Sequence, residues 1–161
     1  MIKAPVLALT AIALIIAGSI YVVNYDDSIT EPHRIISDRF ADNVSTFAPA
    51  NTRNHIAVGM DNGEIHILES GTWDIIATLS GIRPAYITWS PDDSLMLAVV
   101  WDGDTNTQVW RMTDYVLVDT LPTGIFSPAI WNSSGDRFTQ IDDTRIAIWE
   151  TETLSLVNEF A

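Results

Sequence analysis

The stretch from Asp102 to Asn106, Asp-Gly-Asp-Thr-Asn, has the residue types best suited to binding a cation. Its two Asp and its Asn stand at alternating positions, as in the first half of a calcium-binding loop. Such a loop continues with Gly at its sixth position and Glu at its twelfth, but Thr107 and Thr113 stand there. We therefore interpret the stretch as an acidic hairpin turn. A weak calcium site built from several such turns is the alternative.

The other residues form no pattern typical of an enzyme or a metal site. The histidines, His33, His55 and His66, have no second His at a ligand spacing. The sequence contains no cysteine, no Gly-x-Ser-x-Gly nucleophile motif and no glycine-rich loop that opens a helix. It therefore predicts a protein that is not an enzyme, with no catalytic residue, no cofactor and no metal ligand.

The chain is strongly acidic, with a formal net charge of −13 at pH 7. Lys3 is the only lysine, and every acidic residue lies beyond Val23. Nucleic acids and anionic lipid headgroups attract basic surfaces. The charge thus argues against nucleic acid as a partner and favours a protein partner with a basic face.

The first part of the chain differs from the rest, because residues 4–23 are apolar and uncharged. As a helix, 20 residues span about 30 Å, the thickness of a bilayer's hydrocarbon core. Lys3 precedes the segment and Asp26 follows it, so an anchor would keep the N-terminus in the cytoplasm and the rest outside. A cleaved signal peptide, with Ala17 to Ser19 as cleavage site and a secreted or periplasmic product, is the competing interpretation. A buried core helix is a third.

The remainder of the chain contains an internal repeat. Three sets of large apolar residues recur at intervals of 42, 42; 42, 39; and 42, 39 residues: Phe47, Trp89 and Trp131; Leu68, Trp110 and Trp149; Leu79, Leu121 and Phe160. In the middle unit, four β-branched or aromatic runs are separated by turn residues. Four strands in about 42 residues match one blade of a β-propeller. The sequence therefore predicts an all-β fold of three four-stranded antiparallel sheets.

The predicted organisation has three parts. Residues 1–25 form the anchor or signal segment, and residues 26–42 form a linker with a leading outer strand from His33 to Phe40. Residues 43–161 form three blades, about 43–81, 82–122 and 123–161.

These units resemble the WD-repeat family. The strand ending apolar-x-apolar-Trp-Asp has counterparts at Ile65–Glu69, Val109–Arg111 and Ile146–Glu150, and an acidic turn precedes each strand. The Gly-His pair of the family is absent before the first strands, so the chain resembles a divergent member. The resemblance implies a β-propeller that acts as a scaffold for protein–protein interaction.

Three blades are too few to close a ring, since propellers have about four to eight. Three explanations remain open for the apolar faces of the end blades. The chain is the start of a longer propeller, possessing no separate function as a fragment; or it self-associates to complete a propeller; or it forms an open arc capped by a partner.

In the WD-repeat family, partners commonly bind the ring face formed by the second hairpin turns and the loops between blades. The resemblance places Gly81–Pro84, Thr123–Ser127 and three acidic turns on this face. The two tryptophans outside the repeat register are candidates for exposed contact residues. A small-ligand or glycan site that uses Trp73 or Trp101 for stacking is the rival prediction. The candidate interaction residues are Asp61, Arg83, Trp73, Trp101, Asp102, Asp104, Asp142 and Asp143.

Overall fold

The computed structural model describes residues 11–16, 19–24, 42–81, 83–101 and 103–161. The chain divides into two compact units, Met1–Asn43 and Val44–Ala161. All strands of the three large sheets belong to the second unit.

In the first unit, two strands stand where the sequence predicted a helix. β1 (Ala11–Ile16) and β2 (Ser19–Asn24) pair as an antiparallel hairpin. β1 contains three isoleucines, and β2 contains one isoleucine and two valines, and such β-branched residues favour strands. A continuous apolar run does not by itself distinguish a strand from a helix, because it has no periodicity. The other residues of the predicted helix, and the predicted strand from His33 to Phe40, lie outside the described residues.

Within the described ranges, no helix has the length and apolarity that a membrane crossing requires.

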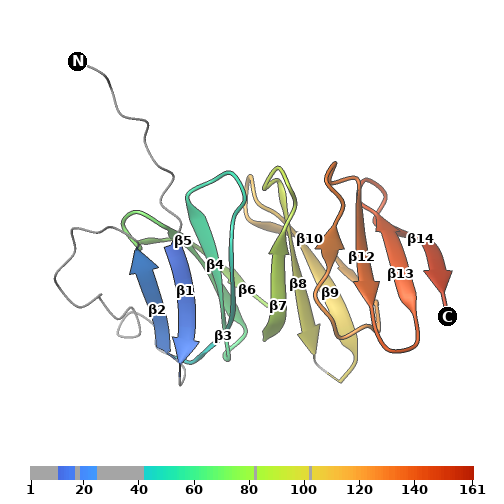
Figure 1. Cartoon of the computed structure of the whole chain (residues 1–161), viewed down its shortest axis with the longest axis horizontal. Helices are drawn as coiled ribbons and strands as arrows, with labels where there is room; N and C mark the ends of the chain where they lie inside the picture. The colour runs from blue at the N-terminus through green and yellow to red at the C-terminus, as the bar shows by residue number, and fades with distance from the viewer. Residues whose placement is uncertain (1–10, 17–18, 25–41, 82, 102) are drawn as a thin grey trace, which may run out of the picture. The chain divides into compact units, whose positions relative to one another are not determined.

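The second unit consists of three four-stranded antiparallel sheets, as the sequence predicted (Figure 1). Sheet 1 contains β3 (Val44–Pro49), β4 (His55–Met60), β5 (Glu64–Glu69) and β6 (Ile75–Ser80). Sheet 2 contains β7 (Pro84–Trp89), β8 (Leu95–Trp101), β9 (Thr105–Arg111) and β10 (Val116–Leu121). Sheet 3 contains β11 (Ile130–Trp131), β12 (Arg137–Ile141), β13 (Ile146–Glu150) and β14 (Ser155–Phe160).

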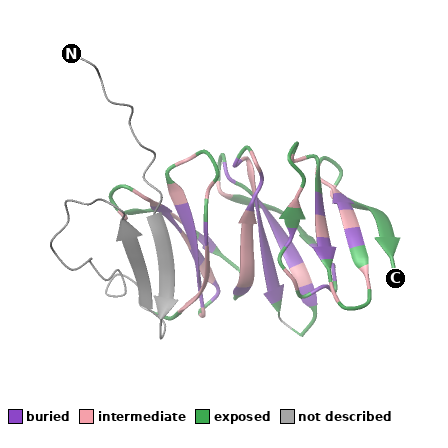
Figure 2. Cartoon of the chain, viewed as in Figure 1, coloured by how far each residue is buried: buried purple, intermediate pink, exposed green. Residues whose placement is uncertain are grey.

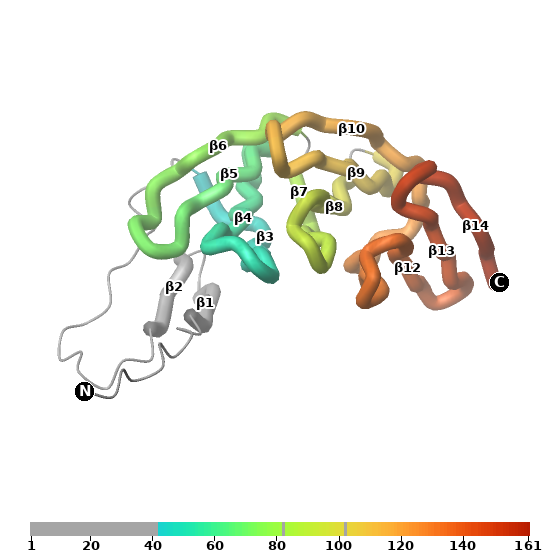
Figure 3. The backbone as a smooth tube through the Cα atoms, turned by 90° about the horizontal axis from the view of Figure 1, so that it is seen from above, coloured from blue at the N-terminus to red at the C-terminus, as the bar shows by residue number. Residues whose placement is uncertain are grey.

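Each sheet pairs its strands in the order in which the chain makes them. Figure 3 shows the sheets following one another, with their fourth strands β6, β10 and β14 along one side. The turns between first and second strands, and between third and fourth strands, lie at one edge of the sheets, which we call the first-turn edge. The turns between second and third strands, and the connections between sheets, lie at the opposite, second-turn edge.

The strand registers confirm two of the three repeat markers. Leu68, Trp110 and Trp149 occupy one equivalent position, because they pair with Ile56, Met96 and Phe138. Leu79, Leu121 and Phe160 occupy another, because they pair with Ile65, Thr107 and Ile146.

The third marker requires a correction. Trp89 and Trp131 pair with Met96 and Phe138, but the residue that pairs with the equivalent Ile56 is Pro49. Phe47 therefore lies two residues before the position that the sequence assigned to it. The cause is the hairpin of β8 and β9. Between equivalent paired residues, the chain there is two residues longer than in sheet 1 and three longer than in sheet 3.

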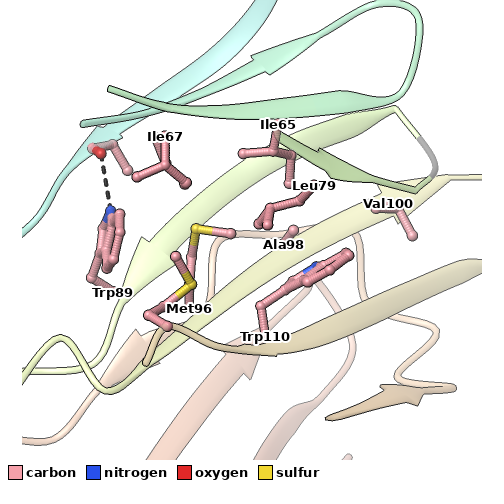
Figure 4. Packing of buried hydrophobic residues seen from close by; sticks show 11 residues of the cluster. Ile65, Ile67, Leu79, Trp89, Met96, Ala98, Val100 and Trp110 are labelled. Carbon is pink, nitrogen blue, oxygen red and sulfur yellow. Dashed lines mark hydrogen bonds between the residues drawn. The ribbon is translucent and has the colours of Figure 1, made fainter. Parts of the chain in front are cut away.

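Two apolar clusters join the sheets. In the first, Ile65, Ile67 and Leu79 of sheet 1 pack against Met96 and Trp110 of sheet 2 (Figure 4). Trp89 extends this cluster and donates a hydrogen bond from Nε1 to the Ala48 carbonyl oxygen over 3.0 Å. Full burial of one of the Ile, Leu or Met side chains of this cluster stabilises the fold by about 2–3 kcal/mol.

The second cluster joins sheets 2 and 3. Leu97, Val109 and Leu121 of sheet 2 pack against Phe138 and Trp149 of sheet 3. Buried residues are concentrated in the middle strands, whereas β14 is exposed along its whole length (Figure 2). Three of the four tryptophans in the repeat register are buried, and the fourth, Trp131, is partly buried against this second cluster.

Candidate functional site

The second-turn edge brings together most of the residues that the sequence singled out. Each connection between sheets is held to the turn before it by a backbone hydrogen bond. Gly81 N–H donates to the Gly63 carbonyl oxygen over 3.0 Å, and Gly124 N–H donates to that of Thr105 over 2.9 Å. Each of these connections is therefore tied to the β-hairpin of the sheet that it leaves.

The long β8–β9 hairpin carries the most exposed aromatic side chain of this edge among the described residues. Trp101 pairs with Thr105 as the last pair of the hairpin, and 59% of its surface is exposed. Its ring meets the Phe126 ring edge-on, with 5.8 Å between centroids and an interplanar angle of 85°. Phe126 itself is 48% exposed and lies 5.5 Å from the Tyr86 ring. We call Tyr86, Trp101 and Phe126 the aromatic patch.

A pocket of about 500 Å³ adjoins the same hairpin. Its lining residues come from the β8–β9 turn, the start of β9 and the connection to sheet 3: Gly103, Asp104, Thr105, Asn106, Pro122 and Gly124. Asp104 is exposed there, so its carboxylate is available to a ligand in this pocket. Asp102, its neighbour in the predicted site, lies outside the described residues.

Asp61 and Arg83 bind each other. Arg83 Nε donates to Asp61 Oδ1 over 2.6 Å, between the β4–β5 turn and the connection to sheet 2. Both residues lie on the predicted surface. Their charges compensate each other, so the pair adds little net charge to the edge.

Asp142 stabilises its own turn. Its Oδ1 accepts hydrogen bonds from Thr144 N–H over 2.7 Å and Arg145 N–H over 2.9 Å, and its Oδ2 accepts from Arg145 Nε over 3.2 Å. The Thr144 backbone and side-chain bonds are the main reason that the pKa of Asp142 falls to about 2. Its neighbour Asp143 is exposed. Among the predicted site residues that the structure describes, Asp143 and Asp104 thus have carboxylates that face solvent and do not stabilise a turn as Asp142 does.

Trp73 lies away from the other candidates. It belongs to the turn between β5 and β6, at the first-turn edge. Its backbone N–H donates to the Glu69 carbonyl oxygen over 2.7 Å. Its φ of 63° is held by that tight turn. Trp73 and Trp101 therefore do not share a surface, and a stacking site can use only one of them.

Sequence reasoning missed Tyr86, and it included Phe126 only as part of the connection Thr123–Ser127, without naming it as a contact residue. A signal for Phe126 was present in the sequence, because Arg83 and Phe126 each follow a Gly-Ile pair in a connection between sheets. Asp61 and Trp101 each lie five residues after an equivalent paired residue, Ile56 and Met96, but Trp101 ends β8 whereas Asp61 begins the turn after β4. The ion pair of the first connection is thus replaced by an aromatic pair in the second.

No protein-family model matches this chain, and no curated protein matches it. The geometry of the described residues therefore carries the functional argument.

The first-turn edge contains a buried carboxylate between sheets 1 and 2. Asp93 is fully buried and accepts hydrogen bonds from the backbone N–H groups of Asn51, Thr52 and Arg53 over 2.7, 2.6 and 2.9 Å. The Thr52 hydroxyl and the Asn51 side-chain amide donate to it as well. Burial alone would raise the pKa of Asp93, but these hydrogen bonds outweigh it and hold the pKa below its ordinary value.

At the equivalent position of sheet 3, the turn has glycine. Asp93 N–H and Gly135 N–H close their turns in the same way, on the carbonyl oxygens of Ser90 and Asn132. Gly135 has a φ of +75°, and a Cβ there would lie 3.3 Å from Pro91 Cδ. The Asp93 carboxylate of sheet 2 thus binds the first turn of sheet 1, and we call this contact with residues 51–53 the clasp. Sheet 3 has no equivalent carboxylate, because Gly135 stands at that position.

The structure brings no metal-binding group together among the described residues, since no three His, Asp or Glu side chains there are placed to hold an ion. Two histidines lie beside carboxylates of sheet 1: His55 Nε2 is 3.6 Å from Glu69 Oε2, and His66 Nε2 is 3.3 Å from Glu64 Oε2. His33 lies outside the described residues. The calcium alternative thus has no support from the described turns.

Proposed function

We propose that the second unit is a group of three β-propeller blades of the WD-repeat type, and that it serves as a scaffold whose aromatic patch binds a basic segment of a partner protein. The observation that carries this proposal is the exposure of Trp101 at the end of a lengthened hairpin. The anchor or signal segment at residues 4–23 would place this scaffold on the outer side of a membrane.

The blade interpretation is supported by the strand order and by the way the sheets pack. Each sheet pairs consecutive strands, and equivalent side chains of sheets 1 and 2, Ile67 and Val109, pack on the next sheet. This is the arrangement expected of neighbouring propeller blades.

Exposed aromatic residues support a binding role for the patch. Water contact with a large apolar ring is unfavourable by about 25 cal/mol per Å², so a partner that covers Trp101 and Phe126 gains that free energy. Tryptophan is enriched among the residues that dominate protein interfaces. Nothing in the sheet register requires an aromatic residue here, because the equivalent residue of sheet 1 is Asp61.

The charges around the patch indicate the chemistry of the partner. Asp104 and Asp143 are exposed at the same edge, and the whole chain carries a net charge of −13. Such a surface attracts basic partners and increases their association rate at low ionic strength. A peptide segment that combines Lys or Arg with an apolar side chain matches both features.

A second candidate function is glycan binding. The pocket with Asp104 and Asn106 adjoins the hairpin of Trp101, and sugar rings are bound by an aromatic face together with polar side chains. Both candidates use Trp101, so the ligand distinguishes them.

The test is selection of a random peptide display library on the immobilised full chain. We expect the selected peptides to be rich in Lys and Arg, and to bind the Trp101→Ala variant at least about tenfold more weakly. Trp73→Ala is the matched control, because it removes a tryptophan at the other edge, and it should leave binding unchanged. Peptides that bind Trp101→Ala as well as the wild type would refute the proposed site.

Charge reversal and glycans complete the test. Asp104→Lys combined with Asp143→Lys should weaken the selected peptides and flatten their salt dependence. If peptides fail but a panel of soluble oligosaccharides quenches tryptophan fluorescence in the wild type and not in Trp101→Ala, the glycan function replaces the scaffold.

A further inference from the structure

A second pocket lies at the first-turn edge, between sheets 2 and 3. Its volume is about 480 Å³, and its walls come from β7, β11 and the first turns of the three sheets. Among the described residues that line it, none is charged, and the amide and hydroxyl side chains are those of Asn51, Thr88, Asn132 and Ser133. We call it the first-turn pocket. It shares no residue with the aromatic patch.

At the corresponding place between sheets 1 and 2, the Asn51 side chain joins the two first turns. Its Nδ2 donates to the Ser90 carbonyl oxygen over 2.9 Å and reaches that of Trp89 over 3.5 Å. It also donates to Asp93 Oδ1 over 3.2 Å. The chain therefore places a primary carboxamide of sheet 1 on backbone acceptors of sheet 2.

Sheet 2 has no such amide to offer to sheet 3, because Pro91 stands at the position of Asn51. Each is the second residue after an equivalent paired residue, Trp89 in sheet 2 and Pro49 in sheet 1. Proline has neither a side-chain amide nor a backbone N–H. The clasp is not repeated here either, since Gly135 provides no carboxylate. The first turns of sheets 2 and 3 thus lack the polar groups that join the first turns of sheets 1 and 2.

The first strands of the sheets also meet differently in the two places. β3 lies against β7, and there Trp89 Nε1 donates to the Ala48 carbonyl oxygen. Trp131 is the counterpart of Trp89, but its buried Nε1 has no hydrogen-bond partner in the described part of the chain. The space between β7 and β11 is therefore not closed by the tryptophan bond that joins β3 to β7, and the first-turn pocket lies there.

The acceptors that Asn51 uses have counterparts in the wall of the pocket, because Trp131 and Asn132 correspond to Trp89 and Ser90. Asn132 N–H donates to the carbonyl oxygen across the turn, so Asn132 belongs to a hydrogen-bonded pair of β11 and β12. Such pairs alternate with pairs that exchange no hydrogen bond, and Trp131 belongs to the latter. Its carbonyl oxygen thus points to the unpaired edge of β11, as that of Trp89 points to Asn51.

We propose that the first-turn pocket binds a primary carboxamide, from an Asn or Gln side chain of a peptide or from a small free amide. Its NH₂ group donates to the carbonyl oxygens of Trp131 and Asn132. Ile130, which is 60% exposed, and Pro91 provide apolar contact for the rest of the ligand. An ionised carboxylate of the same shape accepts hydrogen bonds but cannot donate them, so it does not fit these acceptors.

NMR titration of the ¹⁵N-labelled full chain, in detergent where one is needed, tests this site through its indole N–H resonances. The probe is the peptide Gly-Asn-Gly with acetyl and N-methylamide ends, and the matched probes have Asp or Lys in the middle. We expect only the Asn peptide to shift the resonance that disappears in Trp131→Phe. Binding of the Asp or Lys peptide as tight as that of the Asn peptide, or no shift up to about 10 mM of the Asn peptide, overturns the proposal.

Acetamide distinguishes the two sources of the carboxamide. A shift of the same resonance by acetamide at the concentrations of the Asn peptide indicates a small free amide as the ligand. A shift by the peptide alone indicates that flanking backbone contributes, and thus a peptide segment.

Pro91→Asn gives sheet 2 the carboxamide that sheet 1 has at Asn51. We expect this side chain to occupy the pocket and to weaken the Asn peptide at least about tenfold, because a tethered group competes at high effective concentration. Pro91→Ala is the matched control, since it removes the same proline without adding an amide, and it should bind the peptide as the wild type does. Equal affinity in Pro91→Asn and Pro91→Ala, with thermal transitions like that of the wild type, contradicts the proposal.

The site is also separable from the aromatic patch. Trp101→Ala should leave the affinity for the Asn peptide unchanged, so the first-turn pocket stands even if the patch binds no partner. Loss of the Asn peptide in Trp101→Ala would show that the peptide binds at the other edge, against the proposal.

Discussion

The junction between sheets 1 and 2 and the junction between sheets 2 and 3 use equivalent positions for different chemistry. At the first-turn edge, the first junction contains the buried Asp93 carboxylate, where the second contains Gly135. At the second-turn edge, the first junction ends in the Asp61–Arg83 ion pair, where the second ends in the rings of Trp101 and Phe126.

The comparison distinguishes positions whose side chains hold the sheets together from positions that a ligand can contact. At the first junction, polar groups satisfy one another within the chain, so little of that junction is left for a ligand. At the second, the interior holds a longer hydrogen bond, which Thr107 Oγ1 donates to Gln140 Oε1 over 3.3 Å, and the outer end of the junction exposes aromatic rings. Repeat equivalence thus identifies Trp101 and Phe126 as departures from the pattern that holds the sheets together.

The largest expected effect comes from removing the clasp. Asp93→Gly keeps the positive φ of 58° available and gives sheet 2 the residue that sheet 3 has. It leaves the N–H groups of Asn51, Thr52 and Arg53 without their charged acceptor. We expect a loss of about 3 kcal/mol in the free energy of unfolding by urea denaturation. Asp143→Gly, the same change in an exposed turn, should cost less than about 0.5 kcal/mol. Equal losses would show that Asp93 is not a clasp.

The clasp should also make the protein sensitive to acid. The pKa of Asp93 is lower in the folded chain than its ordinary value of 3.8, so below pH 4 the unfolded chain binds more protons than the folded one. Stability should therefore be constant from pH 7 to about 5 and fall as the pH decreases through the folded pKa. Asp93→Asn should differ most from the wild type above about pH 5, and the two urea curves should converge as the pH falls through the folded pKa. A constant difference over that range would contradict this origin.

Turn geometry in sheet 3 should give a smaller effect. Gly135→Ala places a Cβ 3.3 Å from Pro91 Cδ at a φ of +75°. We expect a loss of about 1–2 kcal/mol in thermal or urea unfolding. Gly71→Ala serves as control, because a Cβ there comes no nearer than 4.0 Å to Glu69 Oε1. If both variants unfold alike, the contact between the turns of sheets 2 and 3 has no energetic role.

The ion pair at the second-turn edge should contribute least. Arg83 and Asp61 are 57% and 34% exposed, and exposed pairs are worth roughly 0–1 kcal/mol. Arg83→Ala should therefore reduce stability by less than about 1 kcal/mol at low salt and by almost nothing at about 1 M salt. Arg83→Phe introduces the residue type that Phe126 has in the second junction. The stability of this variant shows whether an aromatic residue alone can replace the ion pair. A large loss of stability in Arg83→Ala would show that the ion pair holds sheets 1 and 2 together, as Asp93 does.

Much of the fold could be predicted because the repeat is visible in the sequence. Strand residues alternate with turn residues, and the spacing of Leu68, Trp110 and Trp149 fixes the register of the third strands. Phe47 was assigned to the wrong position because the extra length of the β8–β9 hairpin lengthens the interval between Trp89 and Trp131, and the same interval was counted back from Trp89. The length of a hairpin is not evident from the spacing of apolar residues. The strands at residues 11–16 and 19–24 were not predicted for another reason, since an apolar run without period suits a strand as well as a helix.

The candidate site was predicted only in part. The topology places Asp104 and Asp143 at one edge, because alternate turns of consecutive antiparallel strands share an edge, and Trp101 ends the strand that leads into the first of these turns. Their availability was not predictable, since Asp61 and Asp142 look alike in sequence and differ in what donates to them. The burial of Asp93 was equally hidden, because its donors come from a turn some 40 residues earlier.

The consecutive strand order has a consequence for how the chain acquires its structure. Each sheet contains only contacts between strands that are neighbours along the chain, and such short-range contacts form rapidly. During synthesis, sheet 1 can assemble as soon as β6 leaves the ribosome. Its first turn, however, receives its anion only when Asp93 has emerged. The N–H groups of residues 51–53 therefore have their charged acceptor only after the first turn of sheet 2 has been synthesised.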